Sequence, residues 1–537
     1  MDTFVIPPNN PRTPRWLLDL KKWEIQPFDQ IPRDILESEG YGIVSYTWGY
    51  IANFDELATG LPRNVPWDLP TTTKWPLSKA REVMEKIGTR YVWWDWMCVP
   101  QGGKGRLRSL TEELKAVQGE EIGKQLHIYS QARKSIVWLH STNWDESSAL
   151  KSIICLPRPD NIPQERDEIW KYITQAESLL KTARNDEWWL QSGWTLQEGA
   201  LLNSTRLIDG NGTTFSSPDL RHSIHDDKVA RVDDIGDPVT YLAHHLAGTY
   251  FIQLEGHDPD RSRPVLEKFA SSLPKDPETA LKLRRLVKSF TRSGLVGYSQ
   301  FSPLYILAGK QGRNFGRKED SCWALVGALQ LEGMPVKYDI DMDVIKGILL
   351  KALVKKYQCM MLNLPFPELQ FEDEAEKGAT RGFKWIDISE GALLPVSLFL
   401  VKESVDPQVD ETTLPILEFS TALTLKSREK TFSILHGYLK DLEWFCHYRQ
   451  DEDGLRIVNP VTIEDTERSH MQELWLVPIS RVEPRDDVTG RRCLLILDYK
   501  PASPAGNLAL GTFGGQIDVW GTAFSNVDVE EMTLNPS

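Results

Sequence analysis

The chain of 537 residues carries a formal net charge of −14 at pH 7, with 41% hydrophobic and 26% charged residues. That composition is typical of a soluble globular protein, and the length favours two to four domains. The acidic balance disfavours nucleic acid as the main partner, because most of such a surface repels a polyanion.

Strands and helices are predicted to alternate along the first part of the chain. After an N-terminal extension over 1–40, the alternation predicts an α/β domain over 41–212, because each return to the same end of a parallel sheet needs a crossover helix. The expected strands lie at 41–46, 91–95 and 135–139, and the expected helices at about 78–88, 111–132, 165–184 and 187–202. The last helix leads into 206–209 and a Gly-Asn-Gly turn at 210–212, where the domain is expected to close.

The composition changes after this domain. Of the 19 tryptophans, 14 precede residue 200, which favours a domain boundary near residue 210. Periodic apolar positions predict a mainly helical region over 213–358, and short β-branched and aromatic runs predict a β-rich region over 359–537. The basic, glycine-containing loop at 309–318 lacks the spacing of a phosphate-binding loop, and we expect it to be solvated.

The spacing of the cysteines and the length of the apolar runs indicate in which cellular compartment the protein resides. The six cysteines form no CxxC pair and lie in no His-rich neighbourhood, so we expect reduced thiols and no metal site. The first residues contain no apolar run typical of a signal peptide, and no stretch reaches the roughly 18 to 20 apolar residues of a membrane span. A cytoplasmic protein without a membrane span, a metal or a bound cofactor is therefore expected.

Four segments in order resemble the successive motifs of one family, the HET (heterokaryon incompatibility) domain of filamentous fungi. They are YGIVSYTWG at 41–49, RYVWWDWMCVPQ at 90–101, LHIYSQARKSIVWL at 126–139 and SGWTLQEGALL at 192–202. A fifth segment, at 317–329, resembles the stretch that commonly follows this domain. The sequence departs from the usual family pattern at Val99-Pro100 and at Ser192.

The resemblance implies a role in incompatibility, non-self recognition (a form of innate immunity) and programmed cell death. The HET domain is also similar to TIR domains, which implies a TIR-like parallel sheet flanked by helices. Some TIR domains hydrolyse NAD. In that comparison Trp194 and Glu198 match the TIR WxxxE pattern, and Glu198 takes the position of the catalytic glutamate.

The spacing of Trp194 and Glu198 fits such chemistry. Residues four apart share one face of a helix, so an aromatic plane and a carboxylate would project together. A carboxylate stabilises the oxocarbenium-like centre that forms when the nicotinamide–ribose bond breaks. The alternative is a packed indole ring and a solvated or ion-paired acid.

Two strand ends supply further candidates for ligand binding. Ser45 and Trp48 follow the first strand of the sheet, at the edge where open α/β sheets bind ligands. Trp48, Trp96 or Trp194 could stack on a nicotinamide or adenine ring. The alternative is that the hydroxyl caps the next element and the rings pack in the core.

Asp95, Trp96 and Cys98 end the second strand at the same edge. Asp95 is expected to contact a ligand or to order the loop. A nucleophilic Cys98 would need a neighbouring histidine, for which His127 and His140 are the candidates; the alternative is a buried structural thiol.

Two functions from different classes stay open at this point. The first is an NAD glycohydrolase that uses Glu198 and takes NAD as its substrate. The second is a non-enzymatic adaptor whose aromatic-rich domain self-associates or binds a protein partner. Whether activity survives substitution of Glu198 distinguishes the two.

Overall fold

The computed structural model describes residues 5–47, 51–157, 165–218, 220, 227–235, parts of 282–295, residues 306–359 and a set of strands between 416 and 534. The chain divides into two compact units. The first comprises Met1–Pro157, Thr174–Val239 and Arg292–Ile345, and the second comprises Arg158–Ile173, Thr240–Thr291 and Lys346–Ser537.

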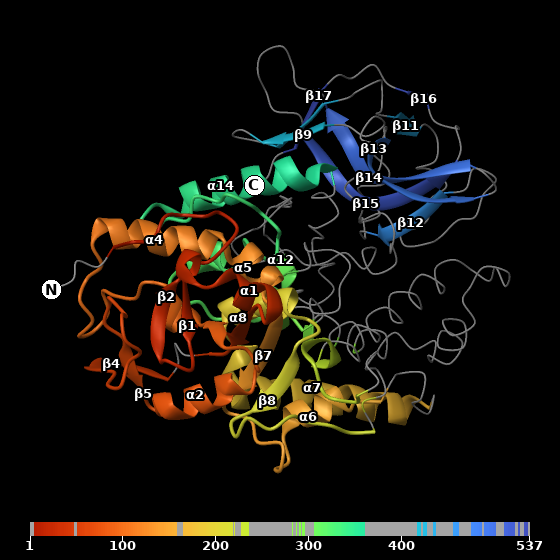
Figure 1. The fold of residues 1–537 in the computed structure, drawn as a ribbon. Coiled ribbons are helices and arrows are strands. Elements are labelled where there is room, and N and C mark those ends of the chain that lie inside the picture. The colour runs from red at the N-terminus through yellow and green to blue at the C-terminus, as the bar shows by residue number, and fades with distance from the viewer. Residues whose placement is uncertain are drawn as a thin grey trace. The chain divides into compact units, whose positions relative to one another are not determined.

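A six-stranded sheet forms the centre of the first unit, in the order β2-β1-β6-β3-β7-β8 (Figure 1). Strands β6, β3, β7 and β8 run parallel, whereas β1 pairs antiparallel with both β2 and β6. The mostly parallel α/β sheet expected from the sequence is therefore confirmed. Its strands are β1 (Trp16–Asp19), β2 (Glu24–Pro27), β3 (Tyr41–Ser45), β6 (Tyr91–Trp93), β7 (Lys134–Leu139) and β8 (Arg206–Asp209).

Residues before Tyr41 contribute two of these strands, so the expected boundary at residue 41 does not coincide with an edge of the sheet. Two ion pairs with buried carboxylates join this stretch to later elements. Asp19 accepts hydrogen bonds from Arg90 Nη2 at 2.7 Å and Nε at 3.0 Å. Arg15 Nη1 lies 3.2 Å from the Glu121 carboxylate. Between β2 and β3 lie η1 (Phe28–Gln30) and α1 (Arg33–Ser38).

Crossover helices connect the parallel strands, and Figure 1 shows α2 on one side of the sheet and α4 and α5 on the other. Thr111 caps α4 by accepting a hydrogen bond from the Leu114 amide at 3.2 Å. The helix expected over 111–132 is divided between α4 and α5, and β6 ends at Trp93. The helices are α2 (Leu77–Glu85), α3 (Asp95–Cys98), α4 (Glu112–Gly123), α5 (Gln125–Gln131), α6 (Ala149–Ile154), α7 (Arg166–Asp186), η3 (Trp188–Leu190) and α8 (Gly193–Leu201).

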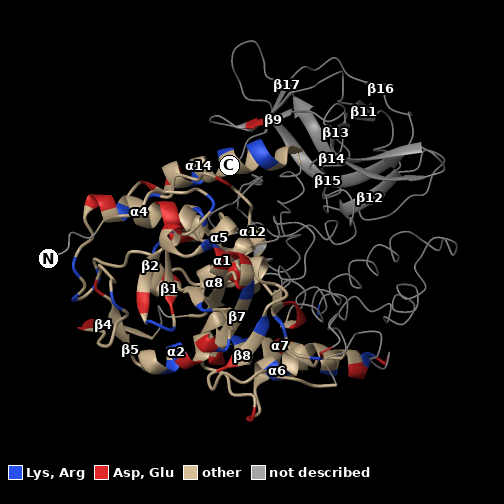
Figure 2. Cartoon of the chain, viewed as in Figure 1, with Lys and Arg blue, Asp and Glu red and all other residues tan. Residues whose placement is uncertain are grey.

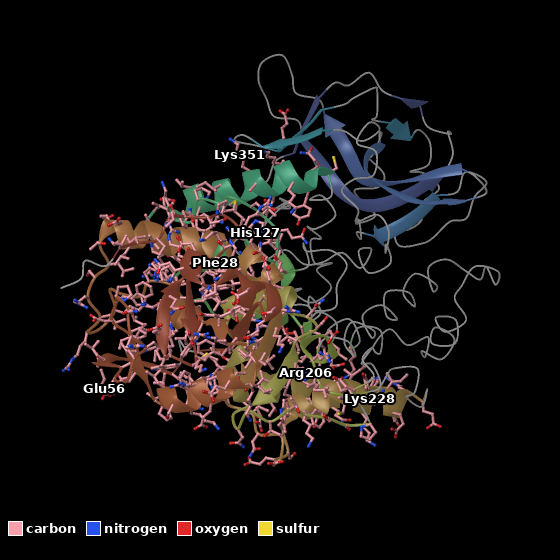
Figure 3. All side chains as sticks on the ribbon, in the orientation of Figure 1. Phe28, Glu56, His127, Arg206, Lys228 and Lys351 are labelled. Atoms are coloured by element: carbon pink, nitrogen blue, oxygen red, sulfur yellow. The ribbon has the colours of Figure 1, made fainter. Side chains whose placement is uncertain are left out.

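Buried aromatic rings fill much of the core. The Tyr46 ring lies 6.1 Å from Trp75, 6.0 Å from Trp94 and 6.3 Å from Trp138, measured between ring centroids. These rings follow or flank the ends of the parallel strands, which explains why tryptophan is concentrated in this part of the sequence. Figure 3 shows the side chains filling the space around the sheet. A hairpin of β4 (Ala52–Leu57) and β5 (Pro70–Thr72) lies outside the main sheet.

The chain beyond residue 235 is described in pieces. Most of 236–305 lies outside the described residues, so the mainly helical region stays a prediction there. The elements before residue 360 are α12 (Ile306–Gly309), η6 (Lys310–Gly312), α13 (Asp320–Trp323) and α14 (Met342–Tyr357).

The described strands after residue 415 pair antiparallel in the orders β17-β10-β9 and β12-β15-β14-β13-β11-β16. The longest, β13, β14 and β15, overlap runs in which the sequence predicts β structure. The strands are β9 (Ile416–Phe419), β10 (Leu423–Lys426), β11 (Ser433–Leu435), β12 (Leu455–Pro460), β13 (Leu474–Arg485), β14 (Val488–Lys500), β15 (Leu510–Trp520), β16 (Ser525–Asn526) and β17 (Glu531–Leu534).

Charged residues of both signs are interspersed along the described helices and loops (Figure 2). Within the described part of the chain, no helix combines the length and apolarity needed to cross a membrane.

Candidate functional site

Polar side chains gather at the carboxyl end of the parallel strands. Ser45 is the last residue of β3, Asp95 follows β6 and begins α3, and His140 follows β7. Parallel strands end at one edge of a sheet, which is where open α/β folds bind their ligands. The structure therefore brings together side chains from three separate segments of the chain.

Helix α8 delivers a carboxyl group to this edge. Ser45 Oγ donates a hydrogen bond of 2.5 Å to Glu198 Oε2, and Trp189 Nε1 donates one of 2.8 Å to Ser45 Oγ. Tyr129 on α5 is a further hydrogen-bond partner of Glu198. Glu198 is 6% exposed, and Ser45 and Trp189 are fully buried. The carboxyl group is thus held by a relay of side chains from β3, η3 and α5.

The environment of Glu198 favours its neutral form. Burial is the largest cause that raises its pKa to about 8, and the negative charge of Asp95 raises it further. The hydrogen bonds from Ser45 and Tyr129 act in the opposite direction but do not compensate. Glu198 is therefore mostly protonated at neutral pH, and any cation brought beside it would favour its ionisation.

Trp194 and Glu198 have different partners. The two residues lie four apart on α8, yet the Trp194 indole hydrogen-bonds the carboxyl group of Asp320. Asp320 also accepts a hydrogen bond of 3.0 Å from the Tyr338 hydroxyl. Trp194 is half-buried, and Asp320 is not among the groups that influence Glu198. Their shared helix face therefore does not give Trp194 and Glu198 a common hydrogen-bond partner.

The residues around Asp95 differ in accessibility. Asp95 is half-buried, and its Oδ1 accepts a hydrogen bond of 2.7 Å from the Trp96 amide. Trp96 is fully buried, with its ring 5.8 Å from Trp75. That packing leaves no face of the Trp96 ring exposed for stacking on a ligand. Trp48, the other ring expected after β3, lies outside the described residues.

Cys98 is fully buried at the end of α3, and burial raises the pKa of its thiol. Its Sγ lies 4.0 Å from the Val92 carbonyl oxygen. Of the two candidate histidines, His140 bonds the Thr47 carbonyl oxygen, and His127, labelled on α5 in Figure 3, lies 3.9 Å from Glu332. A thiol in this environment is poorly suited to act as a nucleophile.

Sequence reasoning missed a second buried carboxyl group near the same edge. Glu187 Oε2 accepts a hydrogen bond of 2.8 Å from Thr142 Oγ1, and its Oε1 accepts one of 3.1 Å from the Trp189 amide. Burial raises the pKa of Glu187 to about 7. The sequence signal is an acidic residue directly before a helical turn, where it caps the free amides.

His140 adds a neutral imidazole to this group. Its Nε2 lies 2.7 Å from the Thr47 carbonyl oxygen, which only accepts, so Nε2 carries the proton. Nδ1 then accepts from the Ser141 hydroxyl at 3.2 Å. Burial lowers the pKa of His140 to about 4. The ring therefore acts as a fixed hydrogen-bonding group at neutral pH.

The comparison with protein families agrees with this geometry. Residues 41–198 match the family model described as Heterokaryon incompatibility protein (HET). These residues are a HET domain. No curated protein and no solved structure matches the chain. The HET match begins at the first residue of β3 and ends at Glu198, so its two ends meet in the contact between Ser45 and Glu198.

The HET domain of this protein shows no sign of a metal centre in its described part. Among the residues that the structure describes, no group of three or more His, Cys, Asp or Glu side chains could hold a metal ion. The described polar groups of the site are the buried carboxyl groups of Glu198 and Glu187, the hydroxyls of Ser45 and Thr142 and the His140 imidazole.

Proposed function

We propose that this protein acts in the cytoplasm in heterokaryon incompatibility, and that its HET domain triggers cell death by hydrolysing NAD with Glu198 as the catalytic carboxyl group. The observation that carries the proposal is the placement of Glu198. The residue lies at the carboxyl edge of the parallel strands, beside Asp95, with a pKa raised to about 8. Perturbed carboxyl groups at such an edge are candidates for catalysis.

The proposed reaction breaks the bond between ribose C1′ and the pyridinium nitrogen. Nicotinamide leaves with the electron pair of that bond, and the cationic C1′ centre is captured by water, which loses a proton. The products are nicotinamide, ADP-ribose and a proton. Ionised Glu198 would stabilise the cationic centre, and the positive pyridinium ring of the bound substrate would itself favour that ionisation.

The buried relay requires an opening step. Glu198 is 6% exposed, so ribose reaches it only if Ser45 or Tyr129 exchanges its hydrogen bond for one from the substrate. Asp95 is half-buried and lies nearer to solvent. Self-association of the domain would supply the free energy for this opening, and activity should accordingly depend on protein concentration.

The direct experiment is nicotinamide release from NAD by concentrated full-length protein, with Glu198→Gln compared with wild type. Glu187→Gln is a matched control, because Glu187 is also a buried carboxyl group with a raised pKa at the same edge. Release that is lost only in Glu198→Gln supports the proposal. Equal release from wild type and Glu198→Gln, or none from assembled wild type, contradicts it.

A non-enzymatic adaptor is the second candidate, and the burial of Glu198 favours it. A buried carboxyl group that accepts hydrogen bonds from two side chains is also what a purely structural residue would look like. In that case, the HET domain would act by self-association or by binding a protein partner. Toxicity that persists on expression of a folded Glu198→Gln variant would select this function.

A further inference from the structure

Helix α8, which carries Glu198, is held by a segment far outside the HET match. We call residues 306–331 the clamp segment. The expectation of a solvated loop at 309–318 is wrong at two of its cations, because Lys310 is 3% and Arg313 is 5% exposed. Residues Arg292–Ile345 also belong to the same compact unit as the sheet.

Arg313 binds the turn that leads into α8. Its Nη1 donates to the carbonyl oxygens of Trp189 at 2.9 Å and Ser192 at 3.4 Å, and its Nε donates to Ser293 O at 2.9 Å. Trp189 is the residue whose indole supports Ser45. The guanidinium group thus ties together η3, the start of α8 and a later part of the chain, using the fixed fork geometry of its donors.

Gln197, the neighbour of Glu198, binds the far end of the clamp segment. Its Oε1 accepts hydrogen bonds from the amides of Gly327 at 2.6 Å and Ala328 at 3.2 Å. Its Nε2 donates to Gln125 on α5, the helix that also supplies Tyr129 to Glu198. Gln197 is 1% exposed, so every one of these bonds replaces a bond to water that is lost on folding.

Close packing at two glycines completes the contact. A Cβ on Gly193 would lie 1.9 Å from the Phe315 ring, and one on Gly309 would lie 3.3 Å from Leu196 Cδ1. The backbone of α8 also pairs with the segment, because Gly193 N donates to Asn314 O at 2.9 Å. The helix is therefore fixed along its length by contacts that leave little room for it to shift.

We propose that the clamp segment completes the HET site from outside the matched range, with Gln197 and Arg313 as positioning residues that set where Glu198 lies. Between α8 and the clamp segment, only Thr240–Thr291 belongs to the second compact unit, whereas β8 and the chain up to Val239 belong to the first. The claim that the clamp segment positions α8 is argued from the contacts of α8 alone. The claim that it affects NAD hydrolysis rests on the proposed function.

Hydrogen exchange of the full-length protein tests the claim that the clamp segment positions α8. The variants are Gln197→Met, Arg313→Met and the milder Arg313→Lys, and Lys318→Met is the matched control at an exposed cation of the same segment. We expect the amides of α8 to exchange about tenfold faster in the three variants, while β3, β6 and β7 stay protected and the control matches wild type. Unchanged exchange of α8 in a folded variant overturns the proposal.

The pH profile of nicotinamide release tests positioning. A loosened α8 lets water reach Glu198, so the midpoint of kcat/KM should fall below its wild-type value in Arg313→Lys and stay unchanged in Lys318→Met. A reduced rate with an unchanged midpoint overturns the positioning role. If wild type releases no nicotinamide, the proposed function fails, and the exchange of α8 still decides whether the clamp exists.

Discussion

Ser45 Oγ lies 2.5 Å from Glu198 Oε2, although 153 positions separate the two residues in the chain. The contact joins the first strand of the HET domain to its last helix. Trp189 supports the serine from one side, and Tyr129 supports the carboxyl group from another. The protonation state of Glu198 consequently depends on residues from the first strand, α5 and η3 together.

Glu198→Gln should stabilise the protein at alkaline pH. The native pKa of about 8 lies above the reference value of 4.5, so the folded state binds the extra proton between these values. Wild-type stability should therefore fall relative to the variant by up to about 1.4 kcal/mol per pH unit from pH 5 to 8. Above pH 8 the difference should become constant.

Urea unfolding at several pH values measures the difference in free energy of unfolding between wild type and Glu198→Gln. Gln mimics the neutral carboxyl group and still accepts a hydrogen bond from Ser45. The exposed Glu177→Gln serves as the control. A difference between wild type and Glu198→Gln that is independent of pH would show that Glu198 is ionised in the folded protein.

Ser45→Ala should cost about 2 to 3 kcal/mol, because it removes the hydroxyl that accepts from the Trp189 indole and one of the two hydrogen-bond partners of the buried Glu198 carboxyl group. It should also raise the pKa of Glu198, since the hydrogen bond from Ser45 lowers that pKa. Denaturant unfolding measures the first effect, and its pH dependence measures the second. Ser130→Ala, at an exposed serine, is the control; equal losses in both variants would contradict the relay.

Activity, if the proposed function holds, should rise with pH. The ionised carboxylate is the form that stabilises a cationic C1′ centre, so kcat/KM should increase tenfold per pH unit below about 8 and level off above it. Nicotinamide release at fixed ionic strength from pH 6 to 9.5 measures this. A profile that falls through pH 8 would instead require the protonated form.

Arg90→Met should destabilise the hairpin of β1 and β2. Burial alone would raise the pKa of Asp19, but its hydrogen bonds with Arg90, Lys22 and Lys21 outweigh burial and lower it. The pair therefore contributes stability above the reference pKa of 3.8 and loses it as pH falls. We expect a loss of about 2 to 3 kcal/mol at pH 7 that shrinks towards pH 3.

Unfolding of Arg90→Met at both pH values tests this pair. Arg133→Met is a control, because Arg133 is exposed and its guanidinium donates to backbone carbonyls of Glu37 and Ser38. If Arg90→Met loses as much free energy of unfolding at pH 3 as at pH 7, packing of the arginine stem, and not the charge of Asp19, accounts for the effect.

Cys98 should resist alkylation in the folded protein. Its thiol is fully buried and its pKa is raised, so the reactive thiolate is scarce. Iodoacetamide at pH 8 followed by mass spectrometry should modify the half-buried Cys155 before Cys98, and both in denaturant. Rapid modification of Cys98 in the native state would contradict this prediction and would support a role as a nucleophile.

Several features of the site can be predicted from the local sequence pattern. The strand ends at Ser45 and Asp95 could be located because buried strands are short apolar runs closed by polar residues. The partner of Trp194 could not be located in this way. Helical spacing says which residues share a face, but not that Asp320, more than a hundred residues later, hydrogen-bonds the indole.

The loop at 309–318 shows most clearly what cannot be predicted from the local sequence. Its cations and glycines predict a solvated loop, because charged side chains are rarely buried unless they are paired or hydrogen-bonded. Arg313 is buried because backbone carbonyls from Trp189, Ser192 and Ser293 accept its hydrogen bonds. Those acceptors are assembled only by the fold and leave no trace in local composition.

The sequence by itself determined the α/β alternation and the HET motifs in order, because periodicity and motif spacing are local properties of the chain. The tertiary structure decided that β1 and β2 extend the sheet, that Glu198 is buried with its pKa raised, and that a distant segment holds its helix. Burial and long-range hydrogen bonds arise from contacts between segments far apart in the chain, and these contacts set the electrostatics of the site.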